Sequence, residues 1–542
     1  MTSPYEDGNP DAKICILGEA PARVEMRQGK PLVGPSGELL ERCMHSAKIV
    51  RRECYLLNVF ETEVFKKREG KLIVDGNGEE LWTSKDGLTE LGIERSKASL
   101  ERLKACKANV IVPLGNTALS IMYGDSRITK WRGSILEARG RKIVPTIHPA
   151  ASLRGNYLWR HLIISDLDRA KKESKSPDLN LPQRELIIDP SYQDVLSWLG
   201  DIKRRVAWDI EALNHQVSCI SFATSRSRVM SIPLLDERGK HRWMPDQELT
   251  IWLEIARILG DPGITKLGMN LIFDIGFILG QMGIHTRGPI QDIMIAQHVM
   301  YPDFPKGLDF ICSMHTREPY YKDDGKMWAR PWNDMELFWQ YNCKDSAVCF
   351  DAWDDELGPA LERDGYLTTY NNTIELFPII LYMQLRGIKV DRTRLEETKH
   401  EVEAAISAKE LELEEAAEYP FNPASPKQCV EYFYVTKGIT PYISRTTGRP
   451  TTDDKAMSRI FRRYNLKEAK LVQEIRALSK LLGTYLEVEF DRDSRVRCSY
   501  NPRGTTTGRL SSSQTIFGTG MNLQNLHPGF KGFLVADNDC TD

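Results

Sequence analysis

Acidic side chains recur in this chain at spacings that bring them onto one face of a strand or helix. Asp209 and Glu211 lie two residues apart in the apolar run Val-Ala-Trp-Asp-Ile-Glu-Ala. In a strand, residues i and i+2 project from the same face, so these two carboxylates point together. Two further pairs are spaced by one helical turn: Asn270 with Asp274, and Tyr341 with Asp345. One strand and two helices thus supply four acids and a phenol.

These residue types suit phosphodiester hydrolysis. In-line hydrolysis uses two divalent cations about 3.5–4 Å apart, one activating water and one stabilising the leaving oxygen. Mg²⁺ and Mn²⁺ prefer carboxylate oxygens as ligands, and a tyrosine hydroxyl can hold the attacking water in line. The sequence therefore predicts a site for two divalent cations, Mg²⁺ or Mn²⁺.

At these residues the sequence resembles the DEDDy family of 3′–5′ exonucleases, with all five motif residues in order between 184 and 363. The resemblance implies that Asp209 bridges both cations and that Glu211 and Asp345 complete the first site. It implies that Asp274 holds the second cation through water and that Tyr341 orients the nucleophilic water. We also expect Asn270 to contact DNA.

Strings further along the chain resemble family-A DNA polymerases, including replicative members from bacteriophages. They are Arg-Gly-Ile-Lys-Val-Asp at 386–391, Thr-Gly-Arg-Leu-Ser-Ser-Ser at 507–513 and Asn-Leu-Gln-Asn-Leu at 522–526. The resemblance implies a thumb over about 392–486 and DNA contacts from Arg509, Gln524 and Asn525. Arg503 shares the Gly/Thr/Ser-rich loop, where backbone can approach phosphates and arginine suits bidentate acceptors.

The sequence ends near the point where such palms carry their first metal-binding aspartate. Asp537 is one candidate for that aspartate, with Asp542 in place of the usual glutamate five residues later. Alternatively, residues 533–536 form the strand that precedes an acidic turn, and the metal-binding strand would follow Asp542. On either interpretation we expect no polymerisation from this chain alone. A shortened product, a gene interrupted by an intron or intein, and one half of a two-chain enzyme all stay open, and a separate chain could carry the rest. The alternative function is a non-catalytic DNA-tethering or scaffold subunit that completes a polymerase in trans.

The N-terminal segment has polar residues at the ends of predicted strands, where α/β folds place ligand sites. Its pattern resembles family 4 of the uracil-DNA glycosylase superfamily over about 13–170. The resemblance implies that Glu19 positions water, Asn58 reads the flipped base and His148 stabilises the departing uracil. Leu32 stands where that family has its stacking phenylalanine. We therefore expect weak or no uracil excision and a fold retained for DNA binding or architecture, with a uracil-excising, repair-coupled replicase as the alternative.

The cysteine pattern departs from the same family. Thr62 stands where one cluster cysteine is expected, Ala22 replaces a glycine, and no Cys-x-x-Cys precedes Lys13. We expect no iron–sulfur cluster. Eleven scattered cysteines are typical of reduced thiols in a cytosol, which would be that of a bacterial host cell if the chain comes from a phage.

The strands and helices expected to position these residues indicate an α/β multidomain protein. Strands at 14–17, 55–60, 110–112 and 143–147 alternate with helices, which predicts a parallel sheet in a glycosylase-like domain. Apolar runs at 72–74 and 81–82, joined across Asp-Gly-Asn-Gly at 75–78, predict a hairpin insertion in this domain. We expect this domain over 1–175, a ribonuclease-H-like exonuclease domain over 184–363, and a polymerase part with a helical thumb and the beginning of a palm over 364–542.

The amino-acid composition and the distribution of charge limit the kinds of partner that the chain can be expected to bind. The 542 residues are 41% hydrophobic and 27% charged, typical of a globular protein, and no apolar run reaches the length of a membrane helix. The net charge is −2, yet residues 436–536 carry 17 Lys/Arg against 8 Asp/Glu. A basic block of this length is consistent with a polyanion-binding face. We expect DNA, as primer–template and as a single-stranded 3′ end, and no membrane.

Overall fold

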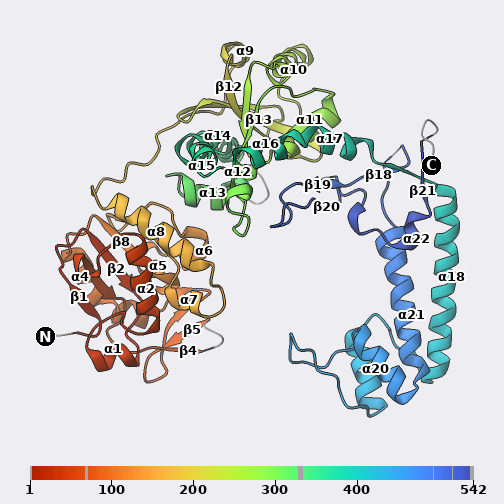
Figure 1. Ribbon diagram of the computed structural model, residues 1–542, viewed down its shortest axis with the longest axis horizontal. Coiled ribbons are helices and arrows are strands. Elements are labelled where there is room, and N and C mark those ends of the chain that lie inside the picture. The colour runs from red at the N-terminus through yellow and green to blue at the C-terminus, as the bar shows by residue number, and fades with distance from the viewer. Residues whose placement is uncertain (1–2, 68–70, 327–333, 492, 516, 538–542) are drawn as a thin grey trace. The chain divides into compact units, whose positions relative to one another are not determined.

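The computed structural model of the chain describes residues 3–67, 71–326, 334–491, 493–515 and 517–537. It divides into two compact units, Met1–Ile374 and Glu375–Asp542. The first unit contains two six-stranded sheets, and the second is built on long helices with small sheets (Figure 1). The predicted α/β multidomain class is confirmed. Among the described helices, none combines the length and apolarity needed to cross a bilayer.

The N-terminal sheet has a parallel centre with an antiparallel strand at each edge. Its spatial order is β1 (Glu6–Gly8), β3 (Cys54–Asn58), β2 (Ile14–Gly18), β8 (Val110–Pro113), β10 (Arg141–Ile143) and β9 (Leu136–Ala138). The helices around it are α1 (Arg23–Gln28), α2 (Pro35–Ser46), α3 (Glu90–Arg95), α4 (Lys97–Ala105), α5 (Gly115–Tyr123), α6 (Ile128–Trp131), α7 (Pro149–Leu153) and α8 (Trp159–Glu173).

Strand β2 illustrates how this sheet is buried on both faces. Ile14 and Ile16 belong to one apolar cluster together with residues of α2 and α8. Cys15 and Leu17 belong to a second cluster with residues of α5. Successive residues of a strand face opposite sides, so a strand covered on both sides is apolar throughout.

Two details of this region extend or correct the sequence prediction. The expected hairpin insertion is a four-stranded sheet: β4 (Phe65–Lys67), β5 (Leu72–Val74), β6 (Glu80–Thr83) and β7 (Gly87–Leu88). The strand expected over 143–147 is wrong in its bounds, because β10 ends at Ile143. Beyond Ile143 the Val144 N–H still donates to the Ile111 carbonyl at 2.9 Å and the Thr146 N–H to the Pro113 carbonyl at 3.0 Å, whereas Pro145 between them has no N–H to donate.

The second sheet of the first unit is mixed. Strands β12, β13 and β14 form an antiparallel meander, and β15 and β16 continue it in parallel. Its order is β11 (Glu185–Ile187), β14 (Arg228–Pro233), β13 (Gln216–Ser225), β12 (Arg205–Leu213), β15 (Thr265–Gly268) and β16 (Ile290–Asp292). Its helices include α9 (Tyr192–Asp201), α10 (Pro245–Gly260), α11 (Leu271–Met282), α12 (Ile293–Met300), α13 (Leu308–His315), α14 (Met335–Ala352), α15 (Gly358–Arg363) and α16 (Leu367–Glu375).

The second unit contains a long helical pair. Helix α18 (Arg392–Ala417) packs beside α21 (Lys467–Leu481), as Figure 1 also shows. An apolar cluster joins the ends of both helices to α20 (Asp454–Tyr464). The remaining elements are α17 (Phe377–Arg386), α19 (Pro426–Val430), α22 (Pro528–Lys531), a sheet of β18 (Arg495–Val496), β17 (Ile388–Val390) and β21 (Leu534–Val535), and a hairpin of β19 (Ser499–Asn501) and β20 (Ser511–Ser513). The domain limits 1–175, 184–363 and 364–542 stay predictions.

Candidate functional site

Three of the predicted acids converge at the junction of β12 and α14. Asp209 and Glu211 leave β12 on the same face, and the intervening Ile210 is 4% exposed on the other. Asp345 reaches them from the middle of α14, and one carboxylate oxygen of each residue lies within 4.8 Å of the other two. A cation could be shared by oxygens at this spacing, so the acids fit the divalent cations expected from the sequence.

Hydrogen bonds from α14 fix Asp209 in this arrangement. The Asn342 Nδ2 donates to Asp209 Oδ2 at 2.9 Å and to the Asp209 carbonyl at 3.2 Å. Ser231 Oγ donates to Asn342 Oδ1 at 2.9 Å, and Ser221 Oγ donates to the Asn342 carbonyl at 2.9 Å. Asn342 therefore ties the helix to three strands and orients one acid. Sequence reasoning missed it, although it adjoins Tyr341.

Asp274 lies beside the cluster rather than within it. Its Oδ1 accepts a hydrogen bond from the Ile210 backbone N–H at 3.1 Å, and the side chain is 3% exposed. It is not among the three acids that lie within 4.8 Å of each other. Asn270 is the N-terminal cap residue of α11, with a left-handed φ of 59°. The roles expected for these two residues, water-mediated metal binding and DNA contact, stay predictions.

Burial and mutual repulsion raise the pKa values of Asp209, Glu211 and Asp274. Burial, then the charge of Asp345, raises the pKa of Asp209 to about 8. Burial and the neighbouring carboxylates also raise the pKa of Glu211, and burial with Asp209 raises that of Asp274. A divalent cation would reverse this effect by favouring the ionised oxygens. Acids that repel one another in a semi-buried site are typical of functional sites.

A loop adds two residues that the sequence did not reveal. Lys322 Nζ donates to Asp345 Oδ2 at 2.7 Å and also to the Tyr341 hydroxyl. Tyr321 donates its hydroxyl to Asp345 Oδ1 at 2.8 Å. Burial, reinforced by Asp345, Glu211 and Asp209, raises the pKa of Tyr341, so its phenol keeps its proton. Nothing in the spacing of this loop marks Lys322 as part of the site.

The four residues predicted for the N-terminal pocket lie around the carboxyl ends of β2 and β3. Asn58 is 1% exposed, and within the described part of the chain neither its Nδ2 nor its Oδ1 has a hydrogen-bond partner. A Cβ on Gly18 would lie 2.3 Å from Asn58 Oδ1 and 3.5 Å from Leu32. His148 Nδ1 accepts from the Ala150 N–H at 3.2 Å and thereby caps α7.

The hairpin insertion brings a lysine to this pocket. Lys66 Nζ lies 2.9 Å from Glu19 Oε1, and Thr117 Oγ1 donates to Glu19 Oε2 at 2.8 Å. Burial favours the neutral acid, but Lys66 and His148 outweigh it and lower the pKa of Glu19. Burial lowers the pKa of His148 to about 4. Glu19 is therefore a carboxylate already paired with an ammonium, which sequence reasoning missed.

In the second unit the predicted DNA-contact residues gather on and beside one hairpin. Arg503 and Arg509 lie in the loop between β19 and β20. Gln524 Nε2 donates to the Leu510 carbonyl at 3.0 Å, which places Gln524 next to that loop, and the exposed Asn525 follows it. Their contacts with DNA stay predictions.

Asp537, one of the two alternatives for a palm metal ligand, is engaged in ion pairs. Its carboxylate contacts Arg386 at 2.8 Å and also Arg495. The strand expected over 533–536 is present as β21, which pairs with β17. Asp542 lies outside the described residues.

Comparisons with known proteins find two family matches in different parts of the chain. Residues 5–167 match the uracil DNA glycosylase superfamily, and residues 392–529 match DNA polymerase family A. The type-4 uracil-DNA glycosylase of Thermotoga maritima is 30% identical over 30% of this chain and 79% of that protein. The DNA polymerase of Bacillus phage SP01 is 22% identical over 94% of this chain and 62% of that protein. The DNA polymerase of Escherichia phage T5 is 26% identical over 52% of this chain and 37% of that protein.

A solved structure of the POL domain of Pol1 from M. smegmatis, in complex with DNA primer-template and dNTP, has a TM-score of 0.49 and 19% identity. The match covers 63% of this chain and 56% of that one.

Fold, sites and matches together define a DNA-processing α/β protein whose N-terminal domain belongs to the uracil-DNA glycosylase superfamily. The chain matches DNA polymerase family A over residues 392–529, and over half of its length or more it is similar to the DNA polymerases of phages. It spans less than two thirds of the length of the polymerases that it matches.

Proposed function

We propose that the acidic cluster is the active site of a 3′–5′ exonuclease that proofreads for a family-A polymerase in DNA replication. The observation that carries this proposal is the convergence of Asp209, Glu211 and Asp345 within 4.8 Å, with the Tyr341 hydroxyl linked to Asp345 through Lys322. Bound divalent cations would supply an activated water and stabilise the leaving oxygen. Asp209, Glu211 and Asp345 would hold them, and Asp274 would assist from the neighbouring helix.

The chain's own residues would position the reactants. Asn342 fixes one Asp209 oxygen, and Tyr321 and Lys322 fix both oxygens of Asp345. The Tyr341 hydroxyl would donate to the attacking water or to a phosphate oxygen and align it with the scissile bond. Such alignment accounts for a large part of catalysis in phosphoryl chemistry, because little covalent work is left to the protein.

The test is digestion of a 3′-end DNA substrate by the full chain with MgCl₂. We expect stepwise shortening from the 3′ end, loss of nearly all of it in Asp209→Ala, and an unchanged rate in the exposed control Asp246→Ala. Digestion by Asp209→Ala at the parental rate would refute the assignment. A parent that binds DNA but never shortens it would favour the alternative, a tethering or scaffold subunit.

A second proposal concerns the N-terminal pocket: it accepts a base but excises uracil weakly. The unpartnered amide of the buried Asn58 favours a base ligand, since a buried polar group without a hydrogen bond is costly. Leu32 offers apolar contact but no π-face, and stacking is worth about 1–3 kcal/mol per base. At 1.36 kcal/mol per tenfold, this loss predicts a deficit of about one to two orders of magnitude.

The measurement is alkali cleavage of a uracil-containing single strand after incubation with the parent, Leu32→Phe or His148→Ala. We expect little cleavage by the parent and a gain with Leu32→Phe. Robust excision by the parent that His148→Ala abolishes would overturn this second proposal.

A further inference from the structure

The loop that carries Lys322 also contacts the N-terminal domain. Lys130 of α6 forms an ion pair with Asp323, Nζ to Oδ2, at 2.5 Å. The same ammonium lies 4.4 Å from the centre of the Tyr320 ring and 4.6 Å from that of Trp131. Trp131 and Tyr320 pack edge to face at 5.5 Å. A largely buried ammonium between two aromatic rings and a carboxylate is a strong local anchor.

The neighbouring residues of this loop contact the acidic cluster. Tyr321 and Lys322 bind the two oxygens of Asp345, and Lys322 also donates to Tyr341. At Gly325 an added Cβ would lie 2.7 Å from Tyr341 Cζ, so the loop backbone lies directly on the phenol ring. We name residues 320–325 the connector loop.

Backbone hydrogen bonds brace the connector loop internally. The Asp324 N–H donates to the Tyr321 carbonyl at 2.9 Å, and the Lys326 N–H donates to the Asp323 carbonyl at 3.1 Å. Lys322 and Asp323 are adjacent within this turn. The Asp323 ion pair with Lys130 is therefore one residue away from Lys322 in a hydrogen-bonded turn.

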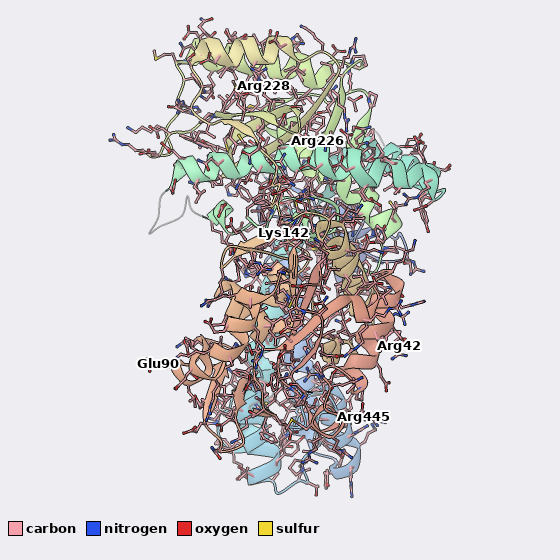
Figure 2. All side chains as sticks on the ribbon, turned by 90° about the vertical axis from the view of Figure 1, so that its left-hand side faces the viewer. Arg42, Glu90, Lys142, Arg226, Arg228 and Arg445 are labelled. Atoms are coloured by element: carbon pink, nitrogen blue, oxygen red, sulfur yellow. The ribbon has the colours of Figure 1, made fainter. Side chains whose placement is uncertain are left out.

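The N-terminal domain is held firmly where Lys130 projects from it. Arg132 donates to Ser313 Oγ at 2.9 Å, and Arg169 donates to the carbonyls of Met314 and Thr316 at 2.8 and 2.7 Å. Glu173 binds Arg317, and it also binds Lys142, which is labelled in Figure 2. These contacts give the Lys130 anchor a fixed position relative to the second sheet.

We propose that the connector loop couples the N-terminal domain to the acidic cluster, with Lys130 holding Lys322 in place as a positioning residue for Tyr341. The inference rests on the proposed exonuclease function. An ammonium has only donors, so the Tyr341 oxygen must accept from Lys322, and its own proton is left for the water or phosphate. Lys322 thus sets the direction in which Tyr341 donates. The glycosylase-like domain then supports nuclease geometry whether or not it excises uracil.

The experiment compares full-length Lys322→Ala, Lys130→Ala and a matched control, Lys172→Ala, which removes an exposed i,i+4 ion pair with Asp168 on the same domain. Each is assayed for single-strand digestion across an MgCl₂ series. A misplacement of about 1 Å costs about a hundredfold in rate. We expect a loss of about a hundredfold in maximal rate for Lys322→Ala, a loss of about tenfold for Lys130→Ala, and no change for Lys172→Ala.

A Tyr341→Phe background separates positioning from simple structural support. The Lys130→Ala effect should be clearly smaller there, since the Tyr341 hydroxyl is gone and only the contact of Lys322 with Asp345 is left to transmit it. An equal loss in both backgrounds would overturn the proposal, as would a parental rate in Lys130→Ala. If Lys322→Ala kept its maximal rate and needed less Mg²⁺, Lys322 would be a competitor of the cation and the assignment would be wrong.

Hydrogen exchange tests the coupling without nuclease activity. Lys130→Ala should accelerate amide exchange in a peptide covering the connector loop, because the Asp323 anchor is lost, whereas Lys172→Ala should not. Unchanged exchange in Lys130→Ala would overturn the proposal even if the exonuclease assignment stands. Faster exchange in a chain that lacks nuclease activity would support the coupling and refute only the proposed function.

Discussion

Asp209→Asn should stabilise the metal-free protein while removing its nuclease activity. Asp209, Glu211 and Asp345 lie within 4.8 Å of one another. At that separation, with an effective dielectric constant of 20, two unit charges repel by about 3 kcal/mol. Lys322 offsets part of this repulsion through Asp345. The amide keeps an acceptor and removes one charge, so we expect a net gain of about 1–3 kcal/mol at pH 8.5.

The sign of the pH dependence follows from the raised pKa of Asp209. Folding moves this pKa from an ordinary value near 3.8 to about 8. Between those values the folded state binds more protons than the unfolded state, so stability falls as pH rises through that window. Asp209→Asn removes this contribution, and its advantage over the parent should therefore grow from pH 6.5 to pH 8.5.

The assay is thermal unfolding in EDTA and in MgCl₂ at both pH values, with Asp246→Asn as an exposed control. A gain of 1 kcal/mol corresponds to about 2–4 °C for a domain of 150–250 residues. Mg²⁺ should raise the parent's melting temperature more at pH 8.5, where fewer protons compete for the oxygens, and should raise that of Asp209→Asn much less. If Asp209→Asn melts at or below the parent in EDTA at pH 8.5, the electrostatic reasoning is refuted.

Three further outcomes follow from the same contacts. Arg132→Ala leaves Asp166, which is 1% exposed, without its ion pair. It should lower the free energy of unfolding, measured by urea titration, by about 3–5 kcal/mol, and a loss below 1 kcal/mol would contradict this. Glu25→Ala leaves the Val33 and Gly34 N–H groups without their carboxylate acceptor and should cost about 1–3 kcal/mol, measured in the same way. Affinity for duplex DNA should fall with salt at a log–log slope of about −0.9 per phosphate contact, and a flat response in a binding titration would remove the case for a basic DNA-binding face.

The periodicity of single elements predicted most of the acidic cluster. The two-residue spacing of Asp209 and Glu211 places both on one face of β12, as expected. The four-residue spacing of Tyr341 and Asp345 places both on α14, and Asp345 joins the cluster. Asp274 is on the expected helix but lies beside the cluster, because the orientation of α11 against β12 is a tertiary property that spacing within a helix does not encode.

The bounds of irregular segments were harder to predict. An apolar run at 143–147 suggested a strand, yet β10 spans Arg141–Ile143 and its pairing with β9 ends at Ile143, although residues 144 and 146 still donate hydrogen bonds to β8. The hairpin was expected from its turn, but its extension to four strands depends on β4 and β7, which are short and lack a clear alternation. Local pattern therefore failed where pairing with a distant strand decides the structure.

Both candidate sites contain a lysine that no motif or spacing in the sequence predicted. Lys66 comes from the hairpin insertion and neutralises Glu19, and Lys322 comes from the connector loop and neutralises Asp345. A lysine has a long flexible stem, so its ammonium can reach a carboxylate from many backbone positions, and its place in the sequence carries little information. Lys66 lowers the pKa of Glu19, and Lys322 donates a hydrogen bond to Asp345. Spacing can therefore predict which carboxylates meet, whereas their ionisation and their chemistry are decided by loops whose paths are set by tertiary packing.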